Sequence, residues 1–576
     1  IYSNTLSHGF VLDDVSVISE NRYVNAGVSG IPEIWKNSYR DGYWNDSGTL
    51  YRPVTQTIFA LLWEVSPNNP ALGHWLNVLL YAGLSWLLFS LFKSLTKNDL
   101  IAFSSSLLFT TTAIHTEVVA NIKSLDEILS LLCALSAWLL LWKNQESKDK
   151  RLLIWASLLF LIGMFSKEGI ISFLVIIPLS FFLLKKSSFK ELISPLIAIA
   201  IPVGIYLLTR SMVLGGITAS VKASTIDNPM VNYSIIERFM TAIKLIGLYA
   251  EKLILPVPLA YEYAFDTITK ASFGDVHFLL GFGIIGASIF GIAKTWKSKP
   301  LLAFGILFSF LSIGLYTNSV VLIGAMFAER FAFAASLGFY LTLTLLLLQY
   351  LKPNVTLLFT VVISVLFAGL SIQRNPAWKS SFSLYEADIE TLESSCKAHY
   401  NYGLELMKQK AANAKNPQEK QKYLALASAQ FEKALEIKPG YQLPKSQLAL
   451  VQYRMGNYPK AIELYEEALA QNTSDDASWN NLAGAYVSTQ QYQKAIDAYQ
   501  KAIEINPNYI DALGNCGAVY GMIGNHEQAI VYLERAHQLA PRNLTYIQYL
   551  GMSHDALGNY TQAKEYSELY GRLQKK

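Results

Sequence analysis

Long apolar runs fill the first 375 residues and leave few folds open to this part of the chain. Ten runs are long enough, or nearly so, to cross a hydrocarbon layer about 30 Å thick as helices. From about residue 395 the chain is instead rich in Lys, Glu, Gln, Asn and Ala. The sequence therefore predicts an all-α protein, a polytopic membrane bundle followed by a soluble helical part. We expect the membrane helices at 72–92, 100–114, 125–142, 152–166, 170–184, 191–209, 277–293, 301–317, 332–349 and 355–372.

An eleventh apolar segment, 239–255, contains Lys244, Glu251 and Lys252. Three charges are expensive inside a membrane span. We therefore interpret this segment as an interfacial or re-entrant helix.

The basic residues of the short loops predict the orientation of the bundle. Loops on one side hold thirteen Lys and Arg residues, whereas the alternate loops hold only Lys123, Lys167 and Arg330. Because basic loops stay in the cytoplasm, the thirteen mark the cytoplasmic side. Residues 1–71, 210–276 and everything after 373 are then expected on the opposite side. The chain starts with Ile1, and we expect a further helix ahead of it, which would make eleven spans.

The soluble part carries a repeat of 34 residues, marked by Ala461, Ala495, Ala529 and Ala563. This pattern resembles the tetratricopeptide repeat, a pair of helices in which small residues allow close approach. An interrupted first copy has Gly403 in its first helix. We expect a linker at 374–395 and a repeat domain at 396–576. Such solenoids bind an extended peptide or a partner protein, so a protein partner for this domain stays open.

Ionisable residues collect on the predicted outer side of the membrane. Each alone has an ordinary explanation, such as an interfacial anchor for Arg52 or a helix cap for Asp13 and Asp14. Their occurrence on one side is what a membrane-embedded site would produce. The candidate site residues are Asp13, Asp14, Arg52, His115, Glu117, Asn121, Asp126, Lys167, Glu168, Glu329 and Arg330.

The candidate residues divide into two chemical kinds. Carboxylates can take a proton from an attacking hydroxyl and stabilise positive charge on a sugar carbon. Arg and Lys can hold a phosphate leaving group, Arg through two parallel hydrogen bonds. A site that combines both, between lipid and water, suits glycosyl transfer from a lipid phosphate.

The order of short motifs resembles the transmembrane and tetratricopeptide-repeat O-mannosyltransferases, within the GT-C membrane glycosyltransferases. The resemblance covers essentially the whole chain. The motifs are Phe-Val-Leu-Asp-Asp (10–14), Tyr-Arg-Pro-Val-Thr (51–55), His-Thr-Glu-Val-Val-Ala-Asn-Ile (115–122), Ser-Lys-Glu-Gly-Ile (166–170), Ala-Glu-Arg-Phe (328–331) and Arg-Asn-Pro-Ala-Trp (374–378), followed by the repeats. The chain departs from the family after the histidine motif, where Lys123-Ser124-Leu125-Asp126 replaces Gly-Arg-Ala-Asp/Glu.

The resemblance implies transfer of mannose, with inversion, from a polyprenyl-phosphate donor (dolichyl or undecaprenyl) to Ser or Thr hydroxyls of an acceptor polypeptide. It implies that Asp13, paired with Asp14, is the catalytic base. We assign sugar or acceptor positioning to His115, Glu117, Asn121, Asp126 and Glu168. We assign binding of the lipid phosphate to Arg52, Lys167, Glu329 and Arg330. The family resembles a metal-independent branch, so a divalent metal is not favoured and no metal ligands are assigned.

Two other readings stay open. The same fold could transfer an oligosaccharide, or a sugar to a lipid or glycan; alternatively, the chain is a non-catalytic scaffold whose repeats recruit partners. The net charge of +4 does not suggest nucleic acid as a partner, and three cysteines do not suggest a disulfide framework. We favour a bacterial inner membrane over the endoplasmic reticulum, with the site and the repeats on the periplasmic or luminal side.

Overall fold

The computed structural model describes residues 1–44, 48–216, 224–265 and 267–574, and the elements in these ranges are helical. The chain divides into two compact units, Ile1–Ser395 and Cys396–Lys576.

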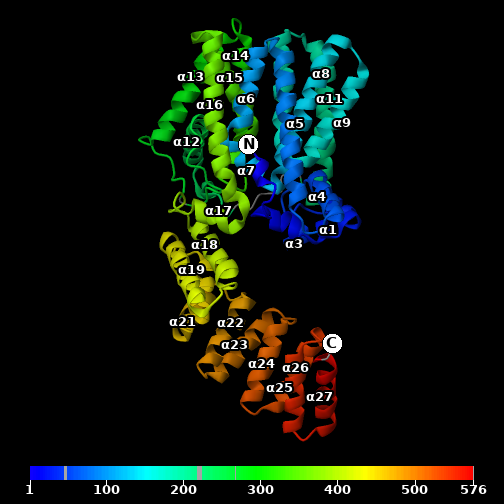
Figure 1. Cartoon of the computed structure of the whole chain (residues 1–576), viewed down its shortest axis with the longest axis vertical. Helices are drawn as coiled ribbons and strands as arrows, with labels where there is room; N and C mark the ends of the chain where they lie inside the picture. Colours follow the sequence, from blue (N-terminus) through cyan, green and yellow to red (C-terminus); the bar gives the residue numbers. More distant parts are fainter. Residues whose placement is uncertain (45–47, 217–223, 266, 575–576) are drawn as a thin grey trace. The chain divides into compact units, whose positions relative to one another are not determined.

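Each of the ten predicted membrane segments is helical, and Figure 1 shows the long helices of the first unit side by side. Among the described residues, seven stretches are long and apolar enough to cross a membrane, which supports an integral membrane protein: Ala71–Thr96, Ile122–Ser147, Glu168–Lys185, Phe189–Leu214, Val276–Thr295, Glu329–Tyr350 and Pro353–Lys379. Asp99–Thr111 and Pro300–Tyr316 are shorter apolar stretches. The long helices are α5 (Ala71–Thr96), α6 (Asp99–Thr111), α8 (Leu125–Ser147), α9 (Lys150–Ser166), α10 (Phe173–Ser180), α11 (Phe189–Leu214), α12 (Ile235–Ile254), α13 (Val276–Thr295), α14 (Pro300–Ile313), α15 (Ala332–Tyr350) and α16 (Pro353–Arg374).

Aromatic side chains fill the core between these helices. Trp138 of α8 is fully buried and makes edge contacts with Phe173 of α10 and with Phe304 and Phe308 of α14. Helices α14 and α15 approach closely at Gly305 and Gly338, where a Cβ on Gly338 would lie 2.7 Å from the Gly305 carbonyl oxygen. The small residues therefore let two backbones meet, as is common between membrane helices.

Shorter helices gather toward the lower end of the bundle of long helices in Figure 1. They are α1 (Arg22–Asn25), α2 (Ile31–Lys36), α3 (Asp41–Trp44), α4 (Pro53–Val65), α7 (Thr116–Ala120) and α17 (Ser381–Asp388). Short 3₁₀ or π turns join them to the long helices, among them η2 (Val15–Ser19), η4 (Ala113–His115), η5 (Ile122–Ser124), η6 (Glu168–Ser172) and η10 (Glu329–Phe331).

The segment predicted as a linker, 374–395, is folded into the first unit instead. Trp378 and Leu384 are buried, and Arg374 forms an ion pair with the buried Asp388. Asp388 also accepts a hydrogen bond from the backbone N–H of Tyr261 at 2.8 Å. The predicted linker is therefore a packed segment that includes α17, and the buried Asp388 of this helix is paired.

Helix α12 covers the segment predicted to be interfacial, and it is not among the seven stretches above. Its Lys244 is paired with Asp275 at 2.6 Å, and Glu251 contacts His277 at 2.7 Å. Lys252 also lies 3.5 Å from Glu251, so each of the three charges that argued against a span has a polar partner.

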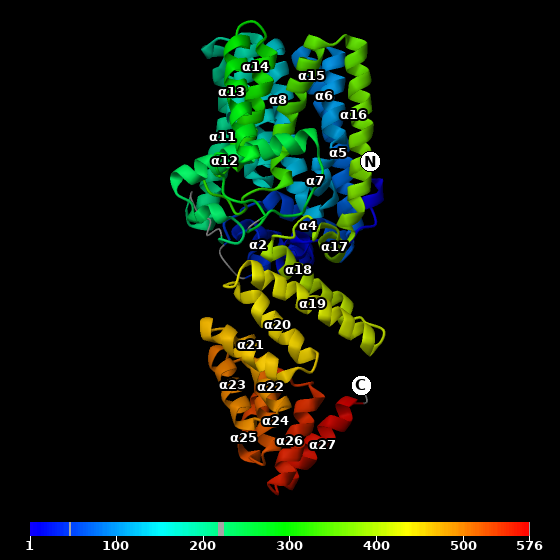
Figure 2. The ribbon, with the colours of Figure 1, turned by 90° about the vertical axis from the view of Figure 1, so that its left-hand side faces the viewer.

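The second unit consists of consecutive helix pairs, and Figure 2 shows α20 to α27 stacked one after another. Ala461, Ala495 and Ala529 of the 34-residue pattern are fully buried. The interrupted first copy is also a helix pair, with Gly403 packed against the ring of Phe431. The helices are α18 (Cys396–Glu405), α19 (Pro417–Ile437), α20 (Gln442–Arg454), α21 (Tyr458–Gln471), α22 (Asp476–Ser488), α23 (Tyr492–Ile505), α24 (Ile510–Met522), α25 (His526–Leu539), α26 (Leu544–Ala556) and α27 (Tyr560–Gln574).

Candidate active site

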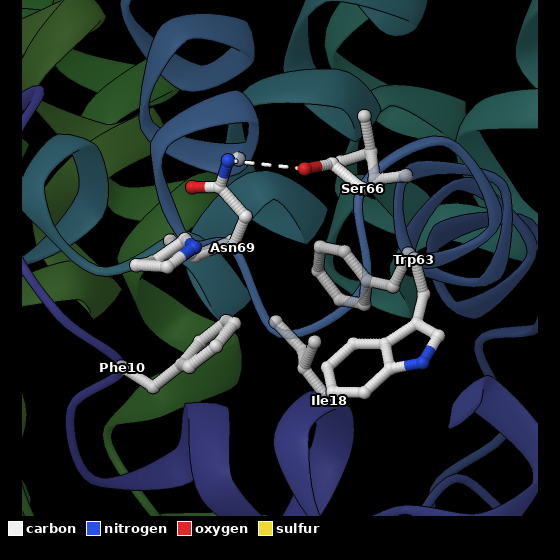
Figure 3. A pocket seen from close by; sticks show the side chains of 10 residues that line it. Phe10, Ile18, Trp63, Ser66 and Asn69 are labelled. Carbon is white, nitrogen blue, oxygen red and sulfur yellow. Dashed lines mark hydrogen bonds between the residues drawn. The ribbon is translucent and has the colours of Figure 1, made fainter.

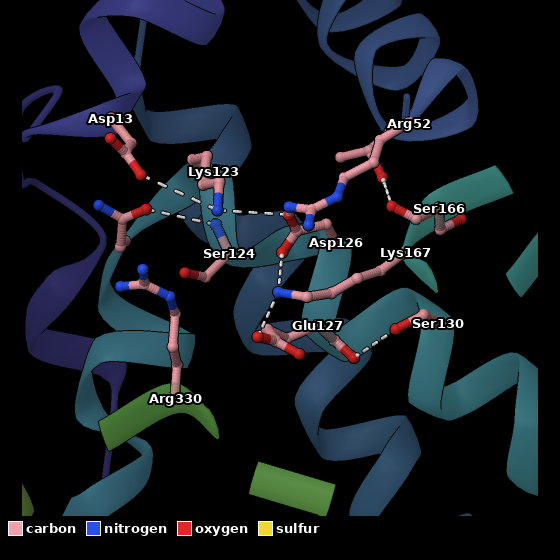
Figure 4. A network of polar contacts seen from close by, with 12 residues as sticks. Asp13, Arg52, Lys123, Ser124, Asp126, Glu127, Ser130, Ser166, Lys167 and Arg330 are labelled. Atoms are coloured by element: carbon pink, nitrogen blue, oxygen red, sulfur yellow. Dashed lines mark hydrogen bonds and ion pairs between the residues drawn. The ribbon is translucent and has the colours of Figure 1, made fainter. Parts of the chain in front are cut away.

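Charged side chains from separate segments of the first unit meet in one network, which Figure 4 shows. At its centre is Asp126, in the first turn of α8, whose side chain is fully buried. Its oxygens lie 2.7 Å from Arg52, 3.4 Å from Lys123 and 3.6 Å from Lys167. The attraction between the three cations and this carboxylate offsets the free-energy cost of removing the four charged groups from water.

Two further carboxylates contact the cations around Asp126. Glu168, at the start of η6, accepts two parallel hydrogen bonds from Arg52, at 3.0 and 2.5 Å. Glu127, next to Asp126, forms an ion pair with Lys167. Arg52 and Lys167 expose only 6% and 5% of their side chains. Both cations are therefore engaged by carboxylates of the protein itself.

Asp13 and Asp14 lie in a tight turn, and they differ in burial and in the groups that they contact. Leu12, directly before them, has a positive φ of 52°, a backbone conformation uncommon for residues other than Gly. Asp14 is fully buried and accepts hydrogen bonds from the backbone N–H groups of Val11, at 2.9 Å, and Lys123, at 2.7 Å. Burial raises the pKa of Asp14 to about 7, although these two N–H groups lower it in part. Asp14 thus joins the turn to η5 and the start of α8.

Asp13 is the accessible member of the pair, with 37% of its side chain exposed. One of its oxygens lies 2.7 Å from Nη2 of Arg40, and the other lies 3.9 Å from Nζ of Lys123. In Figure 4 the side chain of Arg330 rises from η10 toward the same part of the network. Arg330 forms an ion pair with Glu117 of α7, which also accepts a hydrogen bond from the Arg330 backbone N–H at 3.2 Å.

Besides Asp14, three predicted site residues lie outside this set of ion pairs. Both ring nitrogens of His115 lie near hydroxyls, those of Tyr81 at 3.0 Å and Ser336 at 3.1 Å, and the ring is fully buried between Phe109 and Phe333. Asn121 donates to the carbonyl of Val11 and accepts from the N–H of Ser124. Glu329 accepts hydrogen bonds from Ala260 N–H and the Tyr263 hydroxyl, both at 2.7 Å. These three side chains hold neighbouring segments in place.

The candidate list omitted three residues that the structure places in the network. Lys123 lies three positions before Asp126 and Glu127 directly after it, and Arg40, which follows α2, pairs with Asp13. The pattern did contain signals for two of them. Lys123 is one of only three basic residues in the outer short loops, and Glu127 directly follows Asp126 in the first turn of a membrane helix. Nothing in the polar run around Arg40 distinguishes it from the neighbouring surface residues.

A small apolar pocket, with a cavity volume of about 20 Å³, lies behind the Asp13 turn, and Figure 3 shows it. Phe10 and Ile18 line it from the turn, and Trp63 lines it from α4. Its polar edge is formed by Ser66 and Asn69, which are joined by a hydrogen bond of 3.0 Å. Among the described residues, no group of three or more His, Cys, Asp or Glu side chains is placed to hold a metal ion.

Comparison with known proteins adds to this geometry. The chain is 27% identical over 423 residues to a protein O-mannosyl-transferase of Caenorhabditis elegans, F38B6.6, which covers 70% of the chain. It is 24% identical over 455 residues to the human protein O-mannosyl-transferase TMTC1, again over 70% of the chain. Tetratricopeptide-repeat models match residues 446–510 and 498–531. The chain is thus similar to protein O-mannosyl-transferases over 70% of its length, and its second unit matches tetratricopeptide repeats.

The chain spans 58% of the length of the nematode relative and 51% of the human one. A shorter match, 33% identical over 147 residues, links 23% of the chain to human TMTC2. Among solved structures, MamA matches 28% of the chain at 24% identity with a TM-score of 0.26, and the repeat protein YrrB matches 33% at 19% identity with a TM-score of 0.28.

Proposed function

We propose that this protein transfers mannose from a polyprenyl-phosphate donor to Ser or Thr hydroxyls of proteins, with inversion at the anomeric carbon. The relationship to protein O-mannosyl-transferases supports the transferase class. The observation that carries the proposal is the network itself: an accessible carboxylate, Asp13, stands among cations that come from distant parts of a membrane unit. Membrane proteins keep so many charges together chiefly at functional sites.

Asp13 is the catalytic base in this proposal. Its carboxylate is open to solvent, so a hydroxyl can reach it, whereas Asp14 is enclosed by backbone N–H groups. The base removes the hydroxyl proton while the oxygen attacks the sugar from the face opposite the phosphate. Asp14 then serves as a positioning residue for the turn that carries Asp13.

Arg330 binds the departing phosphate in this proposal. It keeps 23% of its side chain exposed, and Glu117 orients it from one side. Arg52 and Lys167, enclosed by Asp126, Glu127 and Glu168, act as positioning residues for the start of α8. The network thus has a buried, structural side and an accessible, reactive side.

The topology follows the same assignment. We infer that all ten predicted segments cross the membrane, that the end carrying α1 to α4 faces away from the cytoplasm, and that the repeats bind the acceptor polypeptide. The site then lies at the membrane surface, where a lipid-linked sugar from the membrane can meet a polypeptide from the aqueous side.

A transfer assay tests the proposal. Purified protein is incubated with radiolabelled polyprenyl-phosphate mannose and a Ser/Thr-rich acceptor, and label on the acceptor is measured. Asp13→Asn should lower the rate by about 100-fold or more, because it removes a positioned base. Asp99→Asn, which changes an exposed carboxylate before α6, is the matched control and should keep the wild-type rate.

Mass spectrometry of the acceptor distinguishes the outcomes. A single added hexose supports the proposal. A larger glycan would instead indicate oligosaccharide transfer by the same fold, and full activity of Asp13→Asn would exclude Asp13 as the base.

A further inference from the structure

The ion pairs of the network balance one another in the absence of any ligand. Five cations stand against five carboxylates: Arg40, Arg52, Lys123, Lys167 and Arg330 against Asp13, Glu117, Asp126, Glu127 and Glu168. Each cation already has a carboxylate partner. An incoming phosphate therefore meets no surplus positive charge among the described residues of the network, and it gains a strong contact only by displacing a carboxylate.

Asp13 is the carboxylate of the network that a phosphate can displace from its cations most easily. Asp126, Glu117 and Glu127 expose less than a tenth of their side chains, and Glu168, although 39% exposed, is held by two parallel hydrogen bonds from Arg52. Asp13 is 37% exposed, and its contact with Lys123 is long, at 3.9 Å.

Arg40 is suited to change partners. Its guanidinium lies 5.0 Å from the centre of the Trp44 ring, so the aromatic face keeps the cation near the site after Asp13 leaves. Its Nε atom is buried and has no hydrogen-bond partner among the described residues. A planar guanidinium with a donor to spare can bind a phosphate through two nitrogens.

We propose that the donor phosphate takes the place of Asp13 against Arg40 and Lys123, so that donor binding itself releases the catalytic base. The inference rests on the proposed function, and it adds Arg40 and Lys123 to Arg330 as residues that bind the phosphate.

Charge is conserved through this exchange. The donor phosphodiester brings one negative charge, and it replaces one carboxylate at the two cations. The freed Asp13 then takes the proton of the acceptor hydroxyl as the new bond to the anomeric carbon forms. The bond from that carbon to the phosphate oxygen breaks, and the polyprenyl phosphate keeps the electron pair and its second negative charge beside Arg40 and Lys123.

Binding of undecaprenyl phosphate to the full chain in detergent, measured by thermophoresis, tests the exchange without any sugar transfer. Asp13→Asn should bind this lipid about five-fold more tightly than the wild type, because the competing carboxylate is gone. Arg40→Ala and Lys123→Ala should each weaken binding about ten-fold, and Arg40→Lys should recover part of the loss. Lys270→Ala, which removes an exposed cation paired with Glu237, is the matched control and should leave binding unchanged.

Equal or weaker binding by Asp13→Asn would overturn the inference. Inorganic phosphate should compete with the lipid at much higher concentration, since the same cations bind it without a lipid tail. Failure to compete at any concentration would also count against the exchange.

Carbodiimide labelling of wild-type carboxylates, located by peptide mass spectrometry, gives a second readout that needs no variant. Saturating undecaprenyl phosphate should increase labelling of Asp13 several-fold and leave Glu168 unchanged as the internal reference. Reduced or constant labelling of Asp13 would contradict the release. A wild type that transfers mannose yet fails these tests would refute the exchange alone, whereas no lipid binding at all would refute the proposed function.

Discussion

The charged network of the first unit and the ion pairs within single repeat helices differ in burial and in sequence separation. In the first unit, Arg52 and Asp126 are 74 positions apart, and their side chains are only 6% and 0% exposed. In the repeat unit, pairs such as Lys501 with Glu504 join residues one helical turn apart, and both side chains are more than half exposed. Exposed pairs contribute at most about 1 kcal/mol, whereas a buried charge without its partner is strongly destabilising. The buried charges of the first network are therefore expected to matter far more for stability than the exposed pairs of the repeats.

The largest effect on stability is expected from Asp126→Ala. The variant leaves Arg52, Lys123 and Lys167 with one carboxylate fewer in a buried setting. It should lower the free energy of unfolding of the first unit by about 3–5 kcal/mol. Thermal unfolding of the purified chain in detergent, followed by tryptophan fluorescence, measures the change.

Glu436→Ala serves as the control, because Glu436 is 70% exposed and pairs with Lys433 on one helix face. If Asp126→Ala changed stability no more than this control, the buried network would have no special importance for the fold.

A pH dependence is expected from Asp14. Burial raises its pKa from the ordinary 3.8 to about 7 in the folded protein. Between these values the folded protein holds a proton that the unfolded chain has released, so stability falls as pH rises through this window. The full difference is on the order of 4 kcal/mol.

Asp14→Asn cannot release this proton. Relative to the wild type, the variant should therefore become progressively more stable from pH 4 to pH 7, while groups that titrate alike in both proteins cancel. Unfolding midpoints measured across this range in parallel check the sign. A difference that stays constant with pH would show that Asp14 is ionised in the folded protein.

The sequence predicts the helices well, and the network only in part. Hydropathy places every long helix, because a membrane imposes a minimum apolar length. The 34-residue period identifies the repeats, because each one buries the same small residues. The outer-side rule also selects Arg52, Asp126, Lys167 and Glu168, which do meet.

The same rule cannot tell which side of a helix a residue occupies. His115 and Glu329 belong to the segments predicted to be outer, yet their side chains bond to Tyr81, Ser336 and Tyr263 and not to the charged network. Arg40 was missed because its importance comes from one contact with Asp13, 27 positions earlier, and no periodic pattern encodes such a contact. Convergence of loop residues depends on tertiary packing, which the local sequence does not specify.

A smaller effect, confined to the repeat unit, is expected from Gly514→Val. A Cβ at Gly514 would lie 2.2 Å from the ring of Tyr546 in the next repeat, so the larger side chain forces the two repeats apart. We expect a loss of about 1–3 kcal/mol. Since each repeat contacts only its neighbours, the unfolding transition of the first unit should not move.

Gly484→Ala provides a control that is expected to stabilise the repeat unit. Its Cβ would meet Tyr453 only at 3.6 Å, an ordinary contact, and alanine favours the helix by about 0.5–1 kcal/mol. Calorimetry of the full chain should therefore show the repeat transition moving down for Gly514→Val and up for Gly484→Ala. A shift of the membrane unit in either variant would contradict the independence of the two units.

The smallest effect is expected from Glu504→Gln on α23. This change removes the 2.7 Å ion pair with Lys501, but both side chains are exposed, at 69% and 56%. Water already solvates the two charges, so the loss should be no more than about 0.5 kcal/mol, and 1 M salt should abolish it. Unfolding of the wild type and the variant at low and high salt measures both quantities. A loss comparable with that of Asp126→Ala, or one that persists in high salt, would mean that burial does not distinguish the two kinds of ion pair.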